Sequence, residues 1–153
     1  MGTEMKIIVF TLANEEYGID VEQVKTIERM QPITRVPRTP SFVKGVINLR
    51  GVVVPVIHLA GRFDLEEGQP TDNTRIIIVT VKDMEVGFIV DSANDVIDID
   101  SDAVNDPPEI VGGIRAKYLR GVAKIGDNRL LILLNLEEVL NKGEISQLGD
   151  VEE

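Results

Sequence analysis

Cysteine is absent from this 153-residue chain, so disulfides, thiol nucleophiles and thiolate metal sites are excluded. Tryptophan is absent too, and aromatic residues make up only 4% of the sequence. Aliphatic side chains must therefore fill any core, and stacking surfaces for bases or sugar rings are not expected. Acidic residues outnumber basic ones, 26 to 16, which gives a net charge of −10. Because this charge repels phosphate backbones and anionic lipids, the sequence favours a protein partner over nucleic acid or a membrane surface.

Long hydrophobic runs are also missing. The apolar stretches are far shorter than the ~20 residues that span a bilayer. No apolar run preceded by basic residues opens the chain. We therefore expect neither export nor direct membrane insertion, and a cytoplasmic location is the default.

Enzyme signatures are absent in turn. The sequence contains no phosphate-binding Gly-Lys-Ser/Thr loop, no Gly-x-Ser-x-Gly motif and no dinucleotide-binding glycine fingerprint. The single histidine, His58, ends an apolar strand pattern and has no second histidine or cysteine for a metal site or a triad. A structural strand histidine is the simplest interpretation. The sequence therefore predicts no catalytic residue, no metal and no cofactor.

An acidic segment from Asp98 to Glu109 supplies the alternative. Its carboxylates occupy several positions of a calcium-binding EF-hand loop. However, Ala103 stands where that loop needs glycine, and Pro107-Pro108 prevents the exiting helix. A solvated acidic connection is the simpler interpretation, and a small metal-binding or catalytic β-barrel using this cluster is the alternative function.

Two sequence echoes predict an internal duplication. Residues 9–12 followed by 16–19 reappear 69 positions later as 78–81 followed by 85–88, with a Thr, a Glu and a Gly repeated. At an offset of 70, residues 49–52 (Leu-Arg-Gly-Val) reappear as 119–122. We therefore expect the chain to contain two copies of one structural unit, with Gly51 and Gly121 in equivalent positions.

Short β-branched runs separated by turn residues predict an all-β fold with little helix. A strand-rich unit of this size removes its exposed edges most economically by closing into a small barrel, so two barrels packed side by side are expected. Short helices are expected at residues 41–44 and at residues 136–141. The expected strands are residues 6–12, 16–20, 46–49, 52–58, 75–82, 85–91, 95–99, 119–125 and 129–135.

Charge is distributed unevenly along the chain. Residues 25–62 contain seven basic residues and one acidic residue, whereas residues 82–109 contain nine acidic residues and one basic residue. Such an asymmetry can steer docking to a neighbouring protein, or it can pair the two segments with each other. Both interpretations stay open.

The motifs at residues 9–12, 16–20, 39–51, 53–56 and 86–91, with Asp95-Val96, resemble those of the bacterial chemotaxis coupling protein family, CheW. The resemblance implies a single domain over residues 1–153 made of two five-stranded SH3-like barrels. The first barrel is expected over roughly 15–80 and the second over roughly 81–145 with the N-terminal strand. A flexible acidic tail is expected at residues 146–153. His58 departs from the family pattern, which usually has aspartate there.

The same resemblance implies a non-catalytic adaptor without cofactors. Such an adaptor couples the cytoplasmic hairpin tip of chemoreceptors to the regulatory domain of the histidine kinase CheA, in the cytoplasm and recruited to membrane-associated receptor clusters. Receptor contacts would lie in the groove between the barrels, at Val24, Thr26, Ile27, Arg50, Gly87 and Val96. For Val24 and Val96, a role in the core is the competing interpretation. Kinase contacts would lie on a barrel end, at Asn105 and Ile110.

Overall fold

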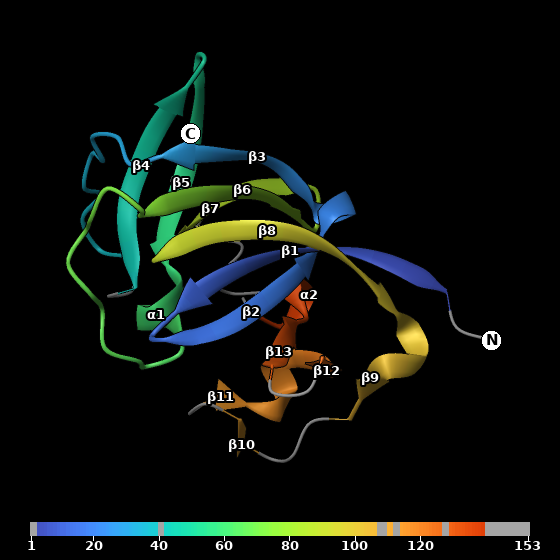
Figure 1. The fold of residues 1–153 in the computed structure, drawn as a ribbon. Helices are drawn as coiled ribbons and strands as arrows, with labels where there is room; N and C mark the ends of the chain where they lie inside the picture. The colour runs from blue at the N-terminus through green and yellow to red at the C-terminus, as the bar shows by residue number, and fades with distance from the viewer. Residues whose placement is uncertain (1–2, 40–41, 107–109, 112–113, 127–128, 140–153) are drawn as a thin grey trace.

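The chain folds mainly into β-strands, as a computed structural model of residues 3–39, 42–106, 110–111, 114–126 and 129–139 shows (Figure 1). Within these ranges, helix is limited to α1 (Leu59–Arg62), α2 (Leu136–Val139) and three 3₁₀ turns. The turns are η1 (Val21–Gln23), η2 (Ser101–Ala103) and η3 (Ala116–Tyr118). The predicted all-β class is confirmed.

Two sheets contain most of the described strands. The five-stranded sheet has the order β3-β6-β7-β5-β4, and the six-stranded sheet has the order β8-β1-β2-β13-β12-β9. The five-stranded sheet consists of β3 (Val24–Arg29), β4 (Val43–Leu49), β5 (Val52–His58), β6 (Arg75–Val81) and β7 (Met84–Val90). The six-stranded sheet consists of β1 (Glu4–Leu12), β2 (Glu15–Asp20), β8 (Ser92–Asp100), β9 (Val104–Asn105), β12 (Leu119–Ile125) and β13 (Arg129–Leu134). A separate short pair is formed by β10 (Ile110–Val111) and β11 (Ile114–Arg115).

Each sheet is closed by the chain that leaves one of its edges. β8 forms one edge of the six-stranded sheet, and after η2 the chain returns as β9 at the opposite edge. β3 forms one edge of the five-stranded sheet, and the chain beyond it pairs with β4 at the opposite edge. There the Thr34 amide donates to the Val46 carbonyl over 2.9 Å. Closure of this kind produces the two small barrels and leaves few strand edges open for aggregation.

The first sequence echo corresponds to a structural repeat. In the hairpin β1–β2, Val9 lies opposite Gly18, and in the hairpin β6–β7, Ile78 lies opposite Gly87. Each hairpin also pairs in parallel with another strand of its sheet, β2 with β13 and β7 with β5. The offset of 69 residues therefore relates positions that have the same place in the two sheets.

The second echo does not mark equivalent positions. Arg50 and Gly51 form the two-residue turn between β4 and β5, with φ values of 54° and 87°, whereas Arg120 and Gly121 lie inside β12. The structural counterpart of Gly121 is Gly45, because each follows a register shift at the start of its strand. The expectation that Gly51 and Gly121 are equivalent was wrong, since the repeated letters form a turn in one unit and a strand in the other.

The two repeats exchange their leading hairpins. The hairpin β1–β2 begins the first repeat but belongs to the six-stranded sheet, whose other four strands come from the second repeat. The hairpin β6–β7 begins the second repeat but belongs to the five-stranded sheet with β3, β4 and β5. The sheets therefore do not divide near residue 15 or between residues 80 and 81, because β2 stays with β1 and β7 stays with β6.

The local expectations had mixed outcomes. Strand β3 was not predicted, and the helical turn expected at residues 41–44 was wrong, since Val43 and Lys44 begin β4. The helix expected from Leu136 is present as α2, while residues 140–141 and the expected tail at 146–153 lie outside the described residues. In the acidic segment, the Asp100 side chain accepts a hydrogen bond from the Asp102 amide at the start of η2.

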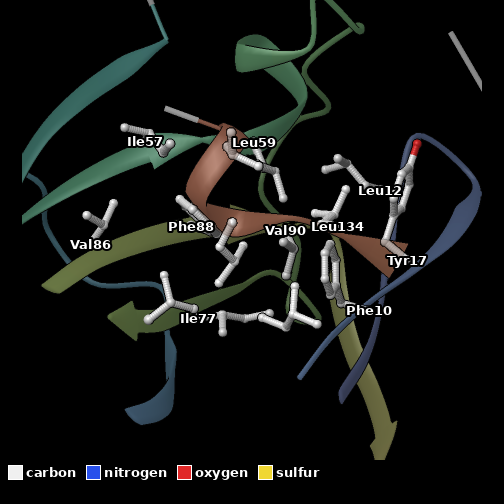
Figure 2. Close-up of a cluster of buried hydrophobic side chains, with 14 of the residues drawn as sticks. Phe10, Leu12, Tyr17, Ile57, Leu59, Ile77, Val86, Phe88, Val90 and Leu134 are labelled. Atoms are coloured by element: carbon white, nitrogen blue, oxygen red, sulfur yellow. The ribbon is translucent and has the colours of Figure 1, made fainter. Parts of the chain in front are cut away.

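A central core joins the two sheets (Figure 2). Phe10 and Tyr17 from β1 and β2 are buried in the same cluster as Ile77 and Phe88 from β6 and β7. The opposite faces of these hairpins are buried in two further clusters, one inside each sheet. Strands buried on both faces carry nearly continuous apolar runs, which is why residues 75–79 read Arg-Ile-Ile-Ile-Val.

We predict that Gly121→Ala destabilises the fold more than Gly51→Ala does. A Cβ at Gly121 would meet the Asn105 carbonyl oxygen at 2.8 Å, and a backbone atom in a paired strand cannot easily move. The expected loss is about 1–3 kcal/mol. A Cβ at Gly51 meets nothing within 4 Å, so only the left-handed backbone is penalised, by about 1 kcal/mol. Urea denaturation measures both, with Gly68→Ala as the control, and equal losses at the two sites would contradict the assignment.

We also predict a pH-dependent contribution from the ion pair between Glu16 and Arg129. Arg129 donates two hydrogen bonds of 2.7 Å to the carboxylate, and these hold the pKa of Glu16 below its ordinary value of 4.5. The pair therefore stabilises the fold above pH 4.5, and this stabilisation disappears as the pH falls through the lowered pKa. Because the pair is exposed, Glu16→Gln should lower the Tm at pH 7 by no more than about 2 °C. A Tm difference that stays constant down to acid pH would refute this effect.

Candidate functional site

The hairpin β4–β5 places Arg50 at the tip of the five-stranded sheet, where Figure 1 shows the hairpin extending past its neighbours. The Gly51 amide donates to the Asn48 side-chain oxygen over 2.8 Å, which fixes the turn. The Arg50 side chain is 73% exposed, and its guanidinium lies 3.9 Å from the Glu28 carboxylate on β3. Arg50 is therefore presented to solvent by a well-defined turn and is held only by a long ion pair.

Exposed apolar side chains lie next to Arg50 in the chain. Val52 is 51% exposed and Val53 is 39% exposed, both at the start of β5. Neither valine is among the predicted contact residues, although two apolar residues directly after a turn could have indicated an exposed apolar contact. Together with the guanidinium, these side chains form a mixed charged and apolar tip that suits a protein partner.

Strand β3 carries three of the predicted receptor contacts. Ile27 is 42% exposed on this edge strand. Val24 is half-buried and packs against the central core, so the competing structural interpretation accounts for its main contacts. The Thr26 hydroxyl is buried with no hydrogen-bond partner among the described residues. Of these three residues, Ile27 is the one that offers a side chain to a docking partner.

Val96 lies on β8, the edge strand of the six-stranded sheet, where it pairs with Ile8 of β1. Its side chain is 54% exposed, so it is not a core residue. Ile27 and Val96 are thus both exposed apolar residues on edge strands, one from each sheet. This placement is compatible with a surface to which both sheets contribute.

Gly87 does not lie on this surface. It is buried in β7, and a Cβ there would meet Ile76 Cγ2 at 2.8 Å and Ile78 Cδ1 at 3.3 Å. A receptor contact at Gly87, as expected from the family resemblance, would need an exposed backbone. The structure instead explains this glycine by the packing of aliphatic side chains inside the five-stranded sheet.

The predicted kinase contacts lie on other strands. Asn105 is exposed on β9, the short edge strand opposite β8, and pairs with Val122. Ile110 lies on β10 and pairs with Arg115. The two predicted contact sets are therefore carried by different strands.

Arg120 has a different setting from Arg50. Its guanidinium lies 3.7 Å from the Asp20 carboxylate and 3.7 Å from Met5 Sδ, so it links β12 to the ends of β2 and β1. Of the two oppositely charged segments, only Lys25 and Glu85 form an ion pair within the described ranges. This contact joins one charge of each segment.

No group of three or more His, Asp or Glu side chains is arranged to hold a metal ion among the described residues. In the same residues, none of the helices has the length and apolar composition needed to cross a membrane.

Comparisons with known proteins agree along the chain. Residues 6–144 match the family described as CheW-like domain. The chain is 46% identical over 140 residues to the chemotaxis protein CheW of Bacillus subtilis, covering 92% of this chain and 89% of that protein. It is 36% identical over 146 residues to the CheW of Klebsiella aerogenes, covering 95% and 87%. The crystal structure of the scaffolding protein TtCheW from Thermoanaerobacter tengcongensis superimposes with a TM-score of 0.85 at 35% identity, covering 94% of this chain and 92% of that one.

We predict that substitutions at the exposed site residues and at the buried Gly87 differ in their effect on the free energy of unfolding. Ile27→Ser and Val96→Ser should change the free energy of unfolding by no more than about 0.5 kcal/mol, because both side chains are largely exposed. Gly87→Ala should destabilise by about 1–3 kcal/mol through overpacking. Chemical denaturation of the three variants checks this order. A stable Gly87→Ala protein would show that the glycine is not required for packing.

Proposed function

This chain belongs to the CheW family of chemotaxis scaffolding proteins, and from that membership we propose that it couples chemoreceptors to the histidine kinase CheA. It is a non-catalytic scaffold. The proposed partners are the cytoplasmic hairpin tip of the receptor and the regulatory domain of the kinase. The proposed location is the cytoplasm, at membrane-associated receptor clusters. The observation that carries the proposal is the match to curated CheW proteins over more than nine-tenths of the chain.

The exposed tip around Arg50 supports the receptor half of the proposal. A receptor hairpin presents helices, and a helix docks through apolar side chains flanked by polar ones. Ile27 and Val96 supply exposed apolar contacts. The Arg50 guanidinium supplies several donors, which suit carboxylates or helix-end carbonyls. Because its ion pair with Glu28 is long, a partner carboxylate can replace that contact at low cost.

The position of Asn105 supports a separate kinase contact. Asn105 lies on β9 at the opposite edge of the six-stranded sheet from β8, which carries Val96. An adaptor must hold two partners at once, so its two contact sets must not overlap. The predicted sets meet this requirement, since they share no strand. The acidic segment gives no comparable support for the alternative metal-binding or catalytic function.

We predict that Arg50→Ala weakens binding of a receptor cytoplasmic fragment by roughly thirtyfold, as expected for a charged anchor worth about 2 kcal/mol. Binding of the kinase regulatory domain should stay within about twofold. Lys82→Ala is the matched control, because Lys82 is also an exposed basic residue at positive φ in a two-residue hairpin turn. Asn105→Ala should show the reverse pattern, with kinase binding lowered and receptor binding kept.

Titration calorimetry with the two purified partner fragments measures the affinities of the unmodified chain and of the three variants, and the Tm of each variant controls for folding. Equal receptor affinity of the Arg50 and Lys82 variants would remove Arg50 from the proposed contact. If the unmodified chain bound neither fragment, the coupling function itself would be wrong.

A further inference from the structure

A cavity of about 600 Å³ opens beside His58, at the end of β5. Its size is in the range of small-molecule sites, which are typically about 300–1,000 Å³. One wall is apolar and is built from Met30, Ile33 and Ile89. The polar lining consists of Arg35, Lys44, His58, Glu67, Gln69, Thr74 and Asp91. The cavity belongs to the five-stranded sheet and shares no residue with the proposed receptor or kinase contacts.

His58 is an unusual component of this lining. The residue is only 7% exposed, yet its Nδ1 has no hydrogen-bond partner among the described residues. A buried polar atom without a partner costs about 1–3 kcal/mol, so such atoms usually have a use. Burial lowers the pKa of His58, with Lys44 acting in the same direction and the Glu67 and Asp91 carboxylates opposing it. The imidazole is therefore neutral at pH 7 and can both donate and accept a hydrogen bond.

The second repeat shows what His58 does not do. His58 precedes α1, and its amide donates to the Phe42 carbonyl over 2.9 Å. Asn135 precedes α2, and its amide donates to the Tyr118 carbonyl over the same distance. The Asn135 side chain accepts a hydrogen bond from the Glu137 amide over 3.2 Å, whereas the His58 side chain makes no such bond to α1. His58 therefore occupies a helix-capping position without capping.

A smaller cavity of about 380 Å³ lies at the equivalent place in the six-stranded sheet. It is lined by Arg120 and Asn135, where the first cavity has Lys44 and His58. There, Arg120 pairs with Asp20, and the Asn135 side chain is used by α2. In the second cavity the Arg120 and Asn135 side chains thus have partners within the chain, whereas His58 Nδ1 beside the first cavity has none among the described residues.

The charges of the first cavity define what it can hold. Lys44 and Glu67 form an ion pair of 2.7 Å. One Asp91 carboxylate oxygen accepts from the Ala13 amide over 3.0 Å, and the other has no hydrogen bond among the described residues. Arg35 has no ion-pair partner in the part of the chain that the structure describes. With His58 neutral, the lining carries two positive and two negative charges, which matches a ligand with one charge of each sign.

We propose that this cavity binds a small zwitterionic molecule of the amino-acid class with an apolar side chain. Arg35 receives the carboxylate, Asp91 receives the ammonium group, and the edge of the His58 imidazole that lines the cavity forms an additional hydrogen bond. Met30, Ile33 and Ile89 cover the apolar side chain. This site does not depend on the adaptor function, and each can fail without the other.

L-leucine is the probe, titrated to about 10 mM because small ligands of this kind often bind weakly. The chain has one histidine, so the NMR signals of its ring report on His58 alone. We expect saturable shifts of these signals. Two analogues test each charge: 4-methylpentanoate lacks the ammonium group and 3-methylbutylamine lacks the carboxylate. Both should bind at least about tenfold more weakly than L-leucine, because each leaves one lining charge unpaired.

The decisive variant is His58→Asn, which copies the residue of the second repeat. It should keep or raise the Tm, since asparagine can cap α1 as Asn135 caps α2, and it should lower L-leucine affinity measured by calorimetry at least tenfold. Asn135→Ala is the control, with a lower Tm and unchanged L-leucine affinity. The proposal is overturned if L-leucine shows no saturable binding, if either analogue binds equally well, or if His58→Asn binds L-leucine like the unmodified chain.

Discussion

The apolar contact between the hairpins β1–β2 and β6–β7 is the interaction on which the rest of the structure depends. Phe10, Tyr17, Ile77 and Phe88 are buried in this contact, and burial of such side chains is the main favourable term in folding. The opposite face of each hairpin packs into a second buried cluster inside its own sheet. A loss of the central core would therefore release both sheets at once. The edge strands and the β4–β5 turn, which carry the proposed contacts, are positioned only because this core is rigid.

The exchange of hairpins explains why a duplicated sequence forms one body. If each repeat had kept its own hairpin, each barrel would be built from one continuous segment, and the two barrels could move apart as separate domains. Here each of the two large sheets contains strands from both repeats, so neither repeat can form a complete sheet alone. The two small helices that follow β5 and β13 then differ in their capping residues, His58 and Asn135. The two repeats thus share one strand arrangement, and their two cavities differ in chemistry because their lining residues differ.

Much of the fold could be predicted because it depends on local pattern. The apolar runs of β1 and β6 and the offset of 69 residues identified the paired hairpins. Strand β3 was missed because its residues, Val-Lys-Thr-Ile-Glu-Arg, place their apolar side chains three positions apart and so lack the apolar–polar alternation typical of a strand. The repeated Leu-Arg-Gly-Val motif wrongly predicted that Gly51 and Gly121 are equivalent. Glycine is needed at Gly51 for a left-handed turn and at Gly121 for a close backbone approach. Of the site, exposure at Arg50 follows from its turn, whereas the burial of Gly87 and the unpaired His58 nitrogen depend on neighbours distant in sequence.

The exchanged hairpins also dictate an order of assembly during synthesis on the ribosome. The strands of the five-stranded sheet end at Val90, so that sheet can close once about three-fifths of the chain has emerged. The hairpin β1–β2 is made first, but its sheet partners extend from Ser92 to Leu134. Until they emerge, the inner face of this hairpin has nothing to pack against, and closing such long loops costs entropy before any contact is gained. The nascent chain therefore exposes the apolar inner face of this hairpin until the strands up to Leu134 have emerged.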